Sequence, residues 1–171
     1  MVKKMYAYCL FCDIRRCNNI AAYLKKQGFE EAFSPQIVKH ERKNGKNEKV
    51  VYDLLPGYVF AFSSEPFTDK ESILSLNGVI RILSSSEMCY LEGDDYRFAQ
   101  KLFECKGIID VVHMIKVGDI VSIKDDIFRE CNGKVIKIDY RKRRAKVEYN
   151  FAGMTLFTWV AYEIIVYNSM C

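Results

Sequence analysis

The chain has 171 residues, of which 50% are hydrophobic and 28% charged, with a net charge of only +4, and this composition is ample for packed cores. No stretch approaches the roughly 20 uninterrupted apolar residues of a membrane span, and the charged N-terminal segment does not match a signal peptide, so we expect a cytoplasmic protein without membrane contact. Seven irregularly spaced cysteines are typical of reduced thiols rather than of a disulfide framework.

The first half of the chain alternates between strand and helix patterns. An aromatic segment at residues 5–11 predicts a strand, and apolar residues at helical spacing within 17–24 predict an amphipathic helix that Gly28 ends. Two further strands are expected on either side of Asn44-Gly45, because this dipeptide readily adopts the positive φ angles of a tight turn. The order is therefore a strand, a helix and a long polar hairpin.

The remaining elements of the first half continue this alternation. Residues 58–62 predict a strand, and the next helix, within residues 64–78, is expected to have Ser64 as its cap. A strand at 79–83 and a helix at 94–105 follow. The first half thus combines strands with helices that can cover them.

From residue 117 onward the pattern changes to short strands separated by turn residues. These strands are expected at residues 119–124, 134–139, 144–149, 154–160 and 163–167. Five short strands indicate a small β-barrel. We therefore predict an α+β protein with an N-terminal domain at residues 1–109, a linker at 110–116 and a barrel domain at 117–171.

Residues 134–146 form the most basic segment of the chain, with seven Lys and Arg residues and a single acidic residue, Asp139. Side chains alternate along a strand, so each strand of this predicted hairpin has an apolar and a polar face. The expected apolar faces hold Ile136 and Ile138 in the first strand and Ala145, Val147 and Tyr149 in the second. The opposite face then carries Lys137, Arg144 and Lys146. Residues 140–143 form the connecting turn.

Two interpretations of this hairpin are open. In the first it is a solvated charged turn in which Asp139 and Glu148 pair with neighbouring cations, although surface ion pairs contribute only about 0–1 kcal/mol each. In the second it binds the phosphates of a nucleic acid, because its positive charge is clustered at a tip beside Tyr140, an aromatic residue that can stack on a base. The candidate RNA-binding residues are Lys134, Lys137, Tyr140, Arg141, Lys142, Arg143, Arg144 and Lys146.

Tyr58, Phe60 and Phe62 share one face of the predicted strand at 58–62. One interpretation is a central strand that is buried on both sides. The other is a partly exposed aromatic patch, which in a soluble domain marks an interaction site. The residues alone leave both interpretations open.

Cys9, Cys12 and Cys17 raise the question of a metal site, because C-x-x-C spacing lets two thiolates reach one ion. His40 is the only histidine near them in the sequence, and no convincing fourth ligand is present, so we expect free thiols, no zinc and no cofactor. The chain also has only two histidines, no phosphate-cradling glycine loop and no nucleophile motif. We therefore expect that the protein is not an enzyme.

The segments "DLLPGYVFAF" and "LNGVIRIL", with a helix between them, resemble the N-terminal domain of the NusG family of transcription elongation factors. The segment "VGDIVSIKDDIFRECNGKVIKIDYRKRRAKVEY" resembles that family's KOW domain. The resemblance implies a NusG-type α/β sandwich domain followed by a five-stranded KOW barrel, and a chain that binds RNA polymerase. The polymerase-binding residues that it implies are Tyr8, Leu55, Tyr58, Phe60, Asp69, Lys70 and Ser72. Leu55 replaces a more usual Phe of the family, and residues 69–72 correspond to the part that touches the opposite rim of the polymerase cleft.

Within the family, "IDYRKRRAKVEY" resembles the LoaP-type paralogues, which are antiterminators whose KOW domain contacts an RNA hairpin. Cys131 and Ala152 stand where ordinary members have aromatic residues, and Asp126-Ile127 replaces a Gly-Pro turn, which puts a ribosomal-protein or termination-factor partner in doubt. We therefore expect a monomeric elongation and antitermination factor that binds RNA polymerase and a nascent RNA hairpin. The alternative is a KOW-containing ribosomal or ribosome-assembly RNA-binding protein.

Overall fold

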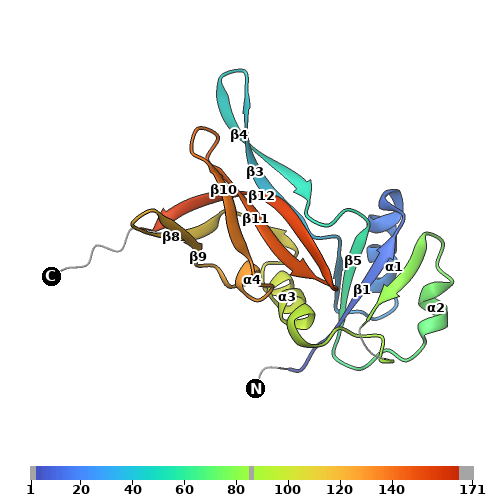
Figure 1. Cartoon of the computed structure of the whole chain (residues 1–171). Coiled ribbons are helices and arrows are strands. Elements are labelled where there is room, and N and C mark those ends of the chain that lie inside the picture. Colours follow the sequence, from blue (N-terminus) through green and yellow to red (C-terminus); the bar gives the residue numbers. More distant parts are fainter. Residues whose placement is uncertain (1–2, 85–86, 166–171) are drawn as a thin grey trace. The chain divides into compact units, whose positions relative to one another are not determined.

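The structure is a computed structural model that describes residues 3–84 and 87–165, except for the side chain of Asp126 (Figure 1). Within these residues the chain forms two compact units. Unit 1 consists of the residues up to Pro35 together with Asp53–Gly107, and unit 2 consists of Gln36–Tyr52 together with the residues from Ile108 onward. No helix in the described part of the chain is long and apolar enough to cross a membrane.

Unit 1 is built on a four-stranded sheet with the strand order β2-β5-β1-β6. The bounds of its strands are Tyr6–Cys12 for β1, Glu31–Phe33 for β2, Tyr58–Ser63 for β5 and Val79–Leu83 for β6. Its helices are η1 at Ile14–Arg16, α1 at Cys17–Lys26, α2 at Lys70–Leu74 and α3 at Gly93–Glu104. The short strand β2 has no counterpart among the sequence predictions, because three residues are too few for a periodic signal.

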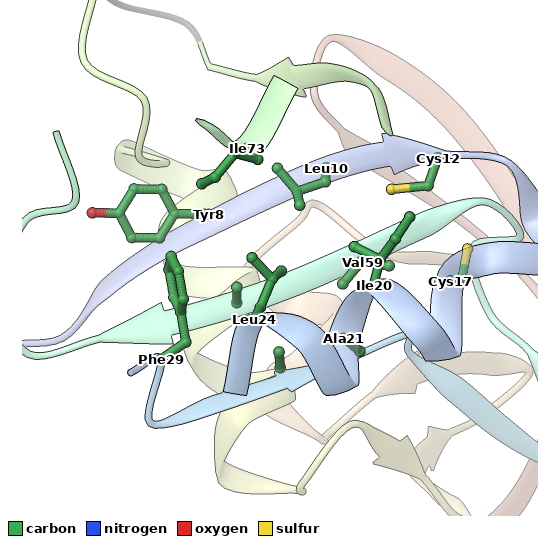
Figure 2. Packing of buried hydrophobic residues seen from close by; sticks show 12 residues of the cluster. Tyr8, Leu10, Cys12, Cys17, Ile20, Ala21, Leu24, Phe29, Val59 and Ile73 are labelled. Atoms are coloured by element: carbon green, nitrogen blue, oxygen red, sulfur yellow. The ribbon is translucent and has the colours of Figure 1, made fainter. Parts of the chain in front are cut away.

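One face of this sheet packs against α1 and α2 (Figure 2). The buried positions of α1 follow the predicted helical spacing, and Gly28, at φ +100°, follows the end of the helix as expected. This face of the sheet contributes Tyr8 and Leu10 from β1 and Val59 from β5 to the core (Figure 2). The α1 face of unit 1 is therefore a closed apolar core.

The opposite face of the sheet packs against α3. Phe60 lies edge-on to Phe98 of α3, with 6.4 Å between ring centroids, and Phe62 lies 4.9 Å from Phe103. Both phenylalanines of β5 are buried. A strand buried on both sides is thus the correct interpretation for the centre of β5.

The second helix is shorter than the sequence pattern predicts. It begins after Asp69, whose Oδ1 accepts a hydrogen bond from the backbone N–H of Ser72 at 3.1 Å. The prediction of Ser64 as the cap is therefore wrong, since an equally good capping residue five positions later is followed by helix-forming residues.

Unit 2 contains a five-stranded sheet with the order β10-β11-β12-β8-β9. Its strands are β8 at Val112–Val117, β9 at Ile120–Ile123, β10 at Lys134–Asp139, β11 at Arg144–Phe151 and β12 at Met154–Ile165. A one-turn helix, α4 at Asp126–Arg129, lies between β9 and β10. Edge strands β9 and β10 also approach each other, so the sheet curls toward a barrel.

The predicted number of strands in this sheet is right, but their identities differ in two places. The segments expected as separate strands at 154–160 and 163–167 belong to one continuous strand, β12, as far as the described residues extend. The fifth strand is β8, which lies within the segment expected as a linker and pairs in parallel with β12. The assignment of residues 1–109 and 117–171 to separate domains stays a prediction.

A second, smaller sheet in unit 2 has the order β4-β3-β7. Strands β3 at Gln36–Lys43 and β4 at Lys46–Asp53 form the expected hairpin around Asn44-Gly45, both of which have positive φ angles. The two-residue strand β7 at Ile108–Ile109 pairs in parallel with β3.

The turn before β10 requires glycine because of a close approach. The N–H of Gly133 donates to the carbonyl oxygen of Phe128 at 2.6 Å, and a Cβ at Gly133 would lie 2.6 Å from that same oxygen. Phe128 is fully buried against Tyr149, with 5.4 Å between ring centroids, and Cys131 is buried beside it. Phe128 is therefore part of the core.

Candidate nucleic-acid interface

The β10–β11 hairpin carries the basic segment, and its turn is held by an acidic residue. Asp139 Oδ1 accepts a hydrogen bond from the backbone N–H of Lys142 at 3.0 Å, and Asp139 Oδ2 lies 3.4 Å from Arg144 Nε. The Lys142 bond, followed by Arg144, lowers the pKa of the Asp139 carboxyl group. Asp139 therefore stays ionised and fixes the turn that presents Tyr140, Arg141, Lys142 and Arg143.

The charge of the hairpin is mostly unpaired. Within the described residues, Arg144 is the only one of its basic side chains that has a carboxylate within 4.0 Å. Glu148 lies opposite Lys134 in the strand register but forms no such ion pair with it. Local pairing therefore neutralises one cation of the hairpin, through Asp139, and RNA binding by the remaining cations stays a prediction.

The expected faces of the hairpin are confirmed for β11 and corrected for β10. Ala145, Val147 and Tyr149 are buried, as the alternation predicts. In β10, however, the register shifts between Val135 and Lys137, so the intervening Ile136 is an unpaired bulge residue and is 47% exposed. Sequence alternation misplaced Ile136 because a bulge adds one residue to the period of two.

The outer face of β11 and β12 adds aromatic residues that the sequence predictions missed. The Arg144 guanidinium lies 4.3 Å from the centroid of the Trp159 ring, and Lys146 Nζ lies 5.2 Å from that of Phe157. Phe157 is 52% exposed. The alternation of β12 places Phe157 and Trp159 on the same face of the sheet. The pairing of Lys146 with Trp159 shows that this face also carries the basic side chains of β11, and this pairing cannot be read from the sequence of β12 alone.

The β3–β4 hairpin is a second source of positive charge in unit 2. Residues 36–52 hold five Lys and Arg residues against two Glu residues. Partial burial, and next the nearby Arg144, lower the pKa of the Lys39 ammonium group, so this lysine lies close to the basic hairpin. The sequence predictions did not place the β3–β4 hairpin beside the basic β10–β11 hairpin, because they assigned residues 1–109 to the N-terminal domain.

A hollow of about 470 Å³ lies beside the tip of the β10–β11 hairpin. It is lined by Tyr140 and Arg143 from the turn and by Tyr162, Glu163 and Ile164 from β12. Tyr140 is 61% exposed. An aromatic side chain and a guanidinium group therefore line an open hollow, together with the carboxylate of Glu163.

The residues expected to bind polymerase do not form one surface in unit 1. Tyr8, Leu55 and Phe60 are at most 4% exposed. Tyr8 belongs to the α1 core (Figure 2) and is paired directly with Ala61, so its side chain lies on the opposite face of the sheet from that of Phe60. Its hydroxyl oxygen accepts a hydrogen bond from the backbone N–H of Phe67 at 2.7 Å, which is a structural role.

Tyr58 is the half-buried member of that set, and it lies in a small cluster. Its ring is 5.1 Å from that of Phe11, and the Arg81 guanidinium is 5.7 Å from the Phe11 ring. Ile14, which is 60% exposed, lies beside Gly57, since a Cβ at Gly57 would be 3.6 Å from Ile14 Cγ1. The sequence predictions missed Phe11 and Ile14, at the end of β1 and the start of η1, and Arg81 of β6, because these residues are far from Tyr58 in the chain.

Asp69, Lys70 and Ser72 lie at the exposed start of α2. Asp69 and Ser72 form the helix cap, which gives these two residues a structural role, and the assignment of all three residues to polymerase binding stays a prediction. Ile73 of the same helix packs into the α1 core, which places α2 on the other side of the sheet from Tyr58.

The N-terminal cysteines do not gather around one point. Cys9 pairs with Phe60, on the α3 face, whereas Cys12 and Cys17 belong to the core on the α1 face (Figure 2). In the described part of the chain, no three His, Cys, Asp or Glu side chains are arranged to hold a metal ion. Burial raises the pKa of the Cys12 thiol to about 12, which disfavours the thiolate form that binds metals.

The comparison with known proteins decides the family. A family model described as transcription termination factor nusG matches residues 5–100, more than half of the chain. This chain belongs to the NusG family. The structural features agree with this assignment: unit 1 supplies the mixed α/β domain and unit 2 a curled five-stranded sheet like that of a KOW domain.

Several proteins that are similar to this chain are named NusG. The transcription termination/antitermination protein NusG of Vibrio cholerae is 24% identical over 146 residues, covering 81% of this chain and 80% of its own length. That of Rickettsia typhi is 27% identical over 129 residues, covering 73% and 66%. A solved structure titled "Domain interaction in Thermotoga maritima NusG" matches with a TM-score of 0.53 at 18% identity, covering 92% of this chain and 93% of that one, which supports the fold. The chain is therefore a NusG-family transcription termination/antitermination factor.

Proposed function

We propose that this protein is an elongation and processive antitermination factor that binds RNA polymerase through its N-terminal domain and a nascent RNA hairpin through its KOW domain. The observation that carries the RNA part is the charge of the β10–β11 hairpin. Apart from Arg144, its basic side chains have no carboxylate within ion-pair distance among the described residues. The resemblance of this hairpin to LoaP-type antiterminators agrees with the proposal.

The physical reason for choosing RNA phosphates is the geometry of the charge. Arg141, Lys142 and Arg143 follow one another in a turn that Asp139 fixes, so three cations are held close together in spite of their mutual repulsion. A polyanion relieves that repulsion and gains further free energy from the release of condensed counterions. The guanidinium groups can also contact phosphates in a bidentate manner.

A base can add to these phosphate contacts at the hollow beside the tip. Tyr140 offers an exposed ring there, and Arg143 lines the same space. The base edges of an A-form stem are poorly accessible, so proteins read its shape and its unstacked nucleotides. We infer that the tip follows the backbone of a stem while Tyr140 contacts a nucleotide that is not paired.

The polymerase part of the proposal rests on the exposed cluster around Tyr58 and on the start of α2. These two surfaces lie on opposite sides of the unit 1 sheet. A factor that contacts both sides of the polymerase cleft favours the closed, elongating state, because a ligand shifts an equilibrium by its differential affinity for the two states. Pausing and termination decrease as a result. RNA held by the second domain raises the effective concentration of the factor at the transcript that carries that RNA.

The RNA contact can be tested by reversing the charge of the tip. The variant Arg141→Glu/Lys142→Glu/Arg143→Glu leaves Arg144 in place, because Arg144 pairs with Asp139 and stacks on Trp159. We expect its affinity for stem-loop RNA from transcript leaders to fall at least roughly a hundredfold in a gel-shift titration, since each lost phosphate contact costs on the order of 1 kcal/mol.

The matched control reverses three exposed lysines elsewhere, Lys26, Lys106 and Lys116, and changes the net charge by the same amount. It should retain most of the RNA affinity. If the tip variant bound RNA as tightly as the native protein, the proposal would fail.

A further inference from the structure

The outer face of the β10–β11–β12 sheet has an arrangement that folding alone does not favour. The strand register places Lys137 opposite Lys146, and Lys146 opposite Trp159, in one row across three strands. The neighbouring row consists of Lys134, Glu148 and Phe157. Like charges directly opposite each other destabilise a sheet, and an exposed aromatic ring leaves apolar area in water.

We propose that this face is a stacking site for unpaired RNA nucleotides, with Phe157 as the stacking platform and Lys137 and Lys146 as phosphate contacts. The inference rests on the proposed RNA-binding function and adds a second site to it, separate from the hairpin tip. The ligand of this second site is single-stranded RNA next to a stem, and the residues that bind it lie outside the tip at residues 140–143.

The choice of single-stranded RNA follows from the chemistry of the face. An aromatic side chain on a sheet can stack only on a base whose face is open, and bases inside a duplex are covered by their neighbours. Phosphates of the same strand then neutralise the facing lysines. An anionic membrane surface would neutralise the lysines but has no planar group to match Phe157, and an acidic peptide does not repeat the alternation of charge and planar group that a nucleotide strand has.

The cation–π contacts position the site before RNA arrives. Arg144 is held between Asp139 and the Trp159 ring, and Lys146 Nζ lies over the Phe157 ring, 5.2 Å from its centroid. The guanidinium plane of Arg144 is itself a surface on which a base can stack. Contacts within the protein therefore order this face before RNA binds, and a base that stacks on the covered side of Phe157 displaces the Lys146 ammonium group.

The experiment uses the full-length protein and two RNA probes. One probe is a blunt stem-loop closed by a stable tetraloop, and the other is the same stem-loop with a single-stranded oligoadenylate tail. Trp159 is the only tryptophan of the chain, so its fluorescence reports directly on this face. We expect the tailed probe to bind about tenfold more tightly than the blunt probe and to quench Trp159 fluorescence, because stacking adds to affinity.

Variants separate this site from the hairpin tip. Phe157→Ala should lose the gain from the tail and keep the affinity for the blunt stem-loop, whereas Phe157→Tyr should retain the gain. Ile120→Ala, which truncates an exposed apolar residue on β9, serves as the matched control and should bind both probes as the native protein does. Thermal unfolding of each variant checks that the fold is intact.

The outcomes distinguish this inference from the proposed function. Equal affinity of the native protein for both probes, with unchanged Trp159 fluorescence, would overturn the stacking site and leave RNA binding by the tip. Failure of the native protein to bind either probe would overturn both.

Discussion

At the scale of single residues, burial separates structural side chains from those available for contact. Tyr58 and Phe60 belong to the same strand face, yet α3 covers Phe60 and leaves Tyr58 half-buried. Alternation in the sequence predicts the shared face correctly. It cannot predict which residues along the strand a helix covers, because that depends on tertiary packing.

Tyr58 is the residue through which the polymerase contact can be tested. Tyr58→Ala should weaken binding to core RNA polymerase by about 2 kcal/mol, roughly thirtyfold, if the residue is a central contact. Phe60→Ala is unsuitable, since truncation of a buried Phe costs about 3–5 kcal/mol of stability. Tyr23→Ala, on the exposed side of α1, is the control. Co-purification of polymerase with the Tyr58 variant at the native level would contradict the assignment.

The thiol of Cys12 is predicted to be unreactive in the folded protein. A rise in its pKa from 9.0 to about 12 lowers the thiolate fraction near neutral pH about a thousandfold. Iodoacetamide labelling followed by peptide mass spectrometry should therefore modify Cys12 only after unfolding in urea, while the more exposed Cys89 reacts in the native state. Equal labelling rates at the two positions would contradict this prediction.

The same shift gives a pH dependence with a defined sign. The folded-state pKa of Cys12 lies above the unfolded value, so the folded protein retains the proton that the unfolded chain releases. The contribution to stability is fully present below about pH 9 and is lost as the pH rises toward about 12. Burial raises the pKa of Cys9 and of Cys17 in the same direction.

At the scale of elements, the sequence pattern predicts most strands and the long helices. It does not predict irregularities such as a bulge or the continuity of a long strand. The strands β6 and β10 have the predicted bounds, because their apolar patterns are bounded by clear turn residues. The bulge at Ile136 and the continuity of β12 through Ala161 and Tyr162 depend on cross-strand pairing, which a single strand's pattern does not contain. The aromatic–basic face was missed for the same reason.

The exposure of Ile136 at the bulge leads to a prediction about the free energy of unfolding. Ile136→Lys should change the free energy of unfolding by no more than about 0.5 kcal/mol, as is usual for surface substitutions, because the side chain is exposed. Val147→Lys, one strand away, should prevent folding of unit 2, since it buries an unpaired charge. Urea denaturation measures both. Comparable destabilisation by the two substitutions would show that Ile136 is a core residue.

At the scale of the whole molecule, the two proposed contacts belong to different units: the polymerase contact to unit 1 and the RNA contact to unit 2. The hydrophobic cluster around Tyr58 belongs to unit 1, whereas both basic hairpins belong to unit 2. The net charge of +4 conceals this separation, because acidic residues elsewhere offset the charge of the hairpins. The family could be inferred from the sequence, but the assignment of residues 36–52 to unit 2 could not, since strand order in the chain does not determine which unit a hairpin joins.

The central claim, that the hairpin tip holds RNA phosphates, is tested most directly by the salt dependence of binding. The logarithm of the binding constant falls linearly with the logarithm of salt concentration, with a slope of about 0.7–0.9 for each phosphate that is neutralised. For a stem-loop RNA, the native protein should show a steep slope. Replacing Arg141, Lys142 and Arg143 by Glu should reduce the magnitude of that slope by roughly 2 to 3. An unchanged slope together with an unchanged affinity would contradict the claim and return the hairpin to a solvated charged turn.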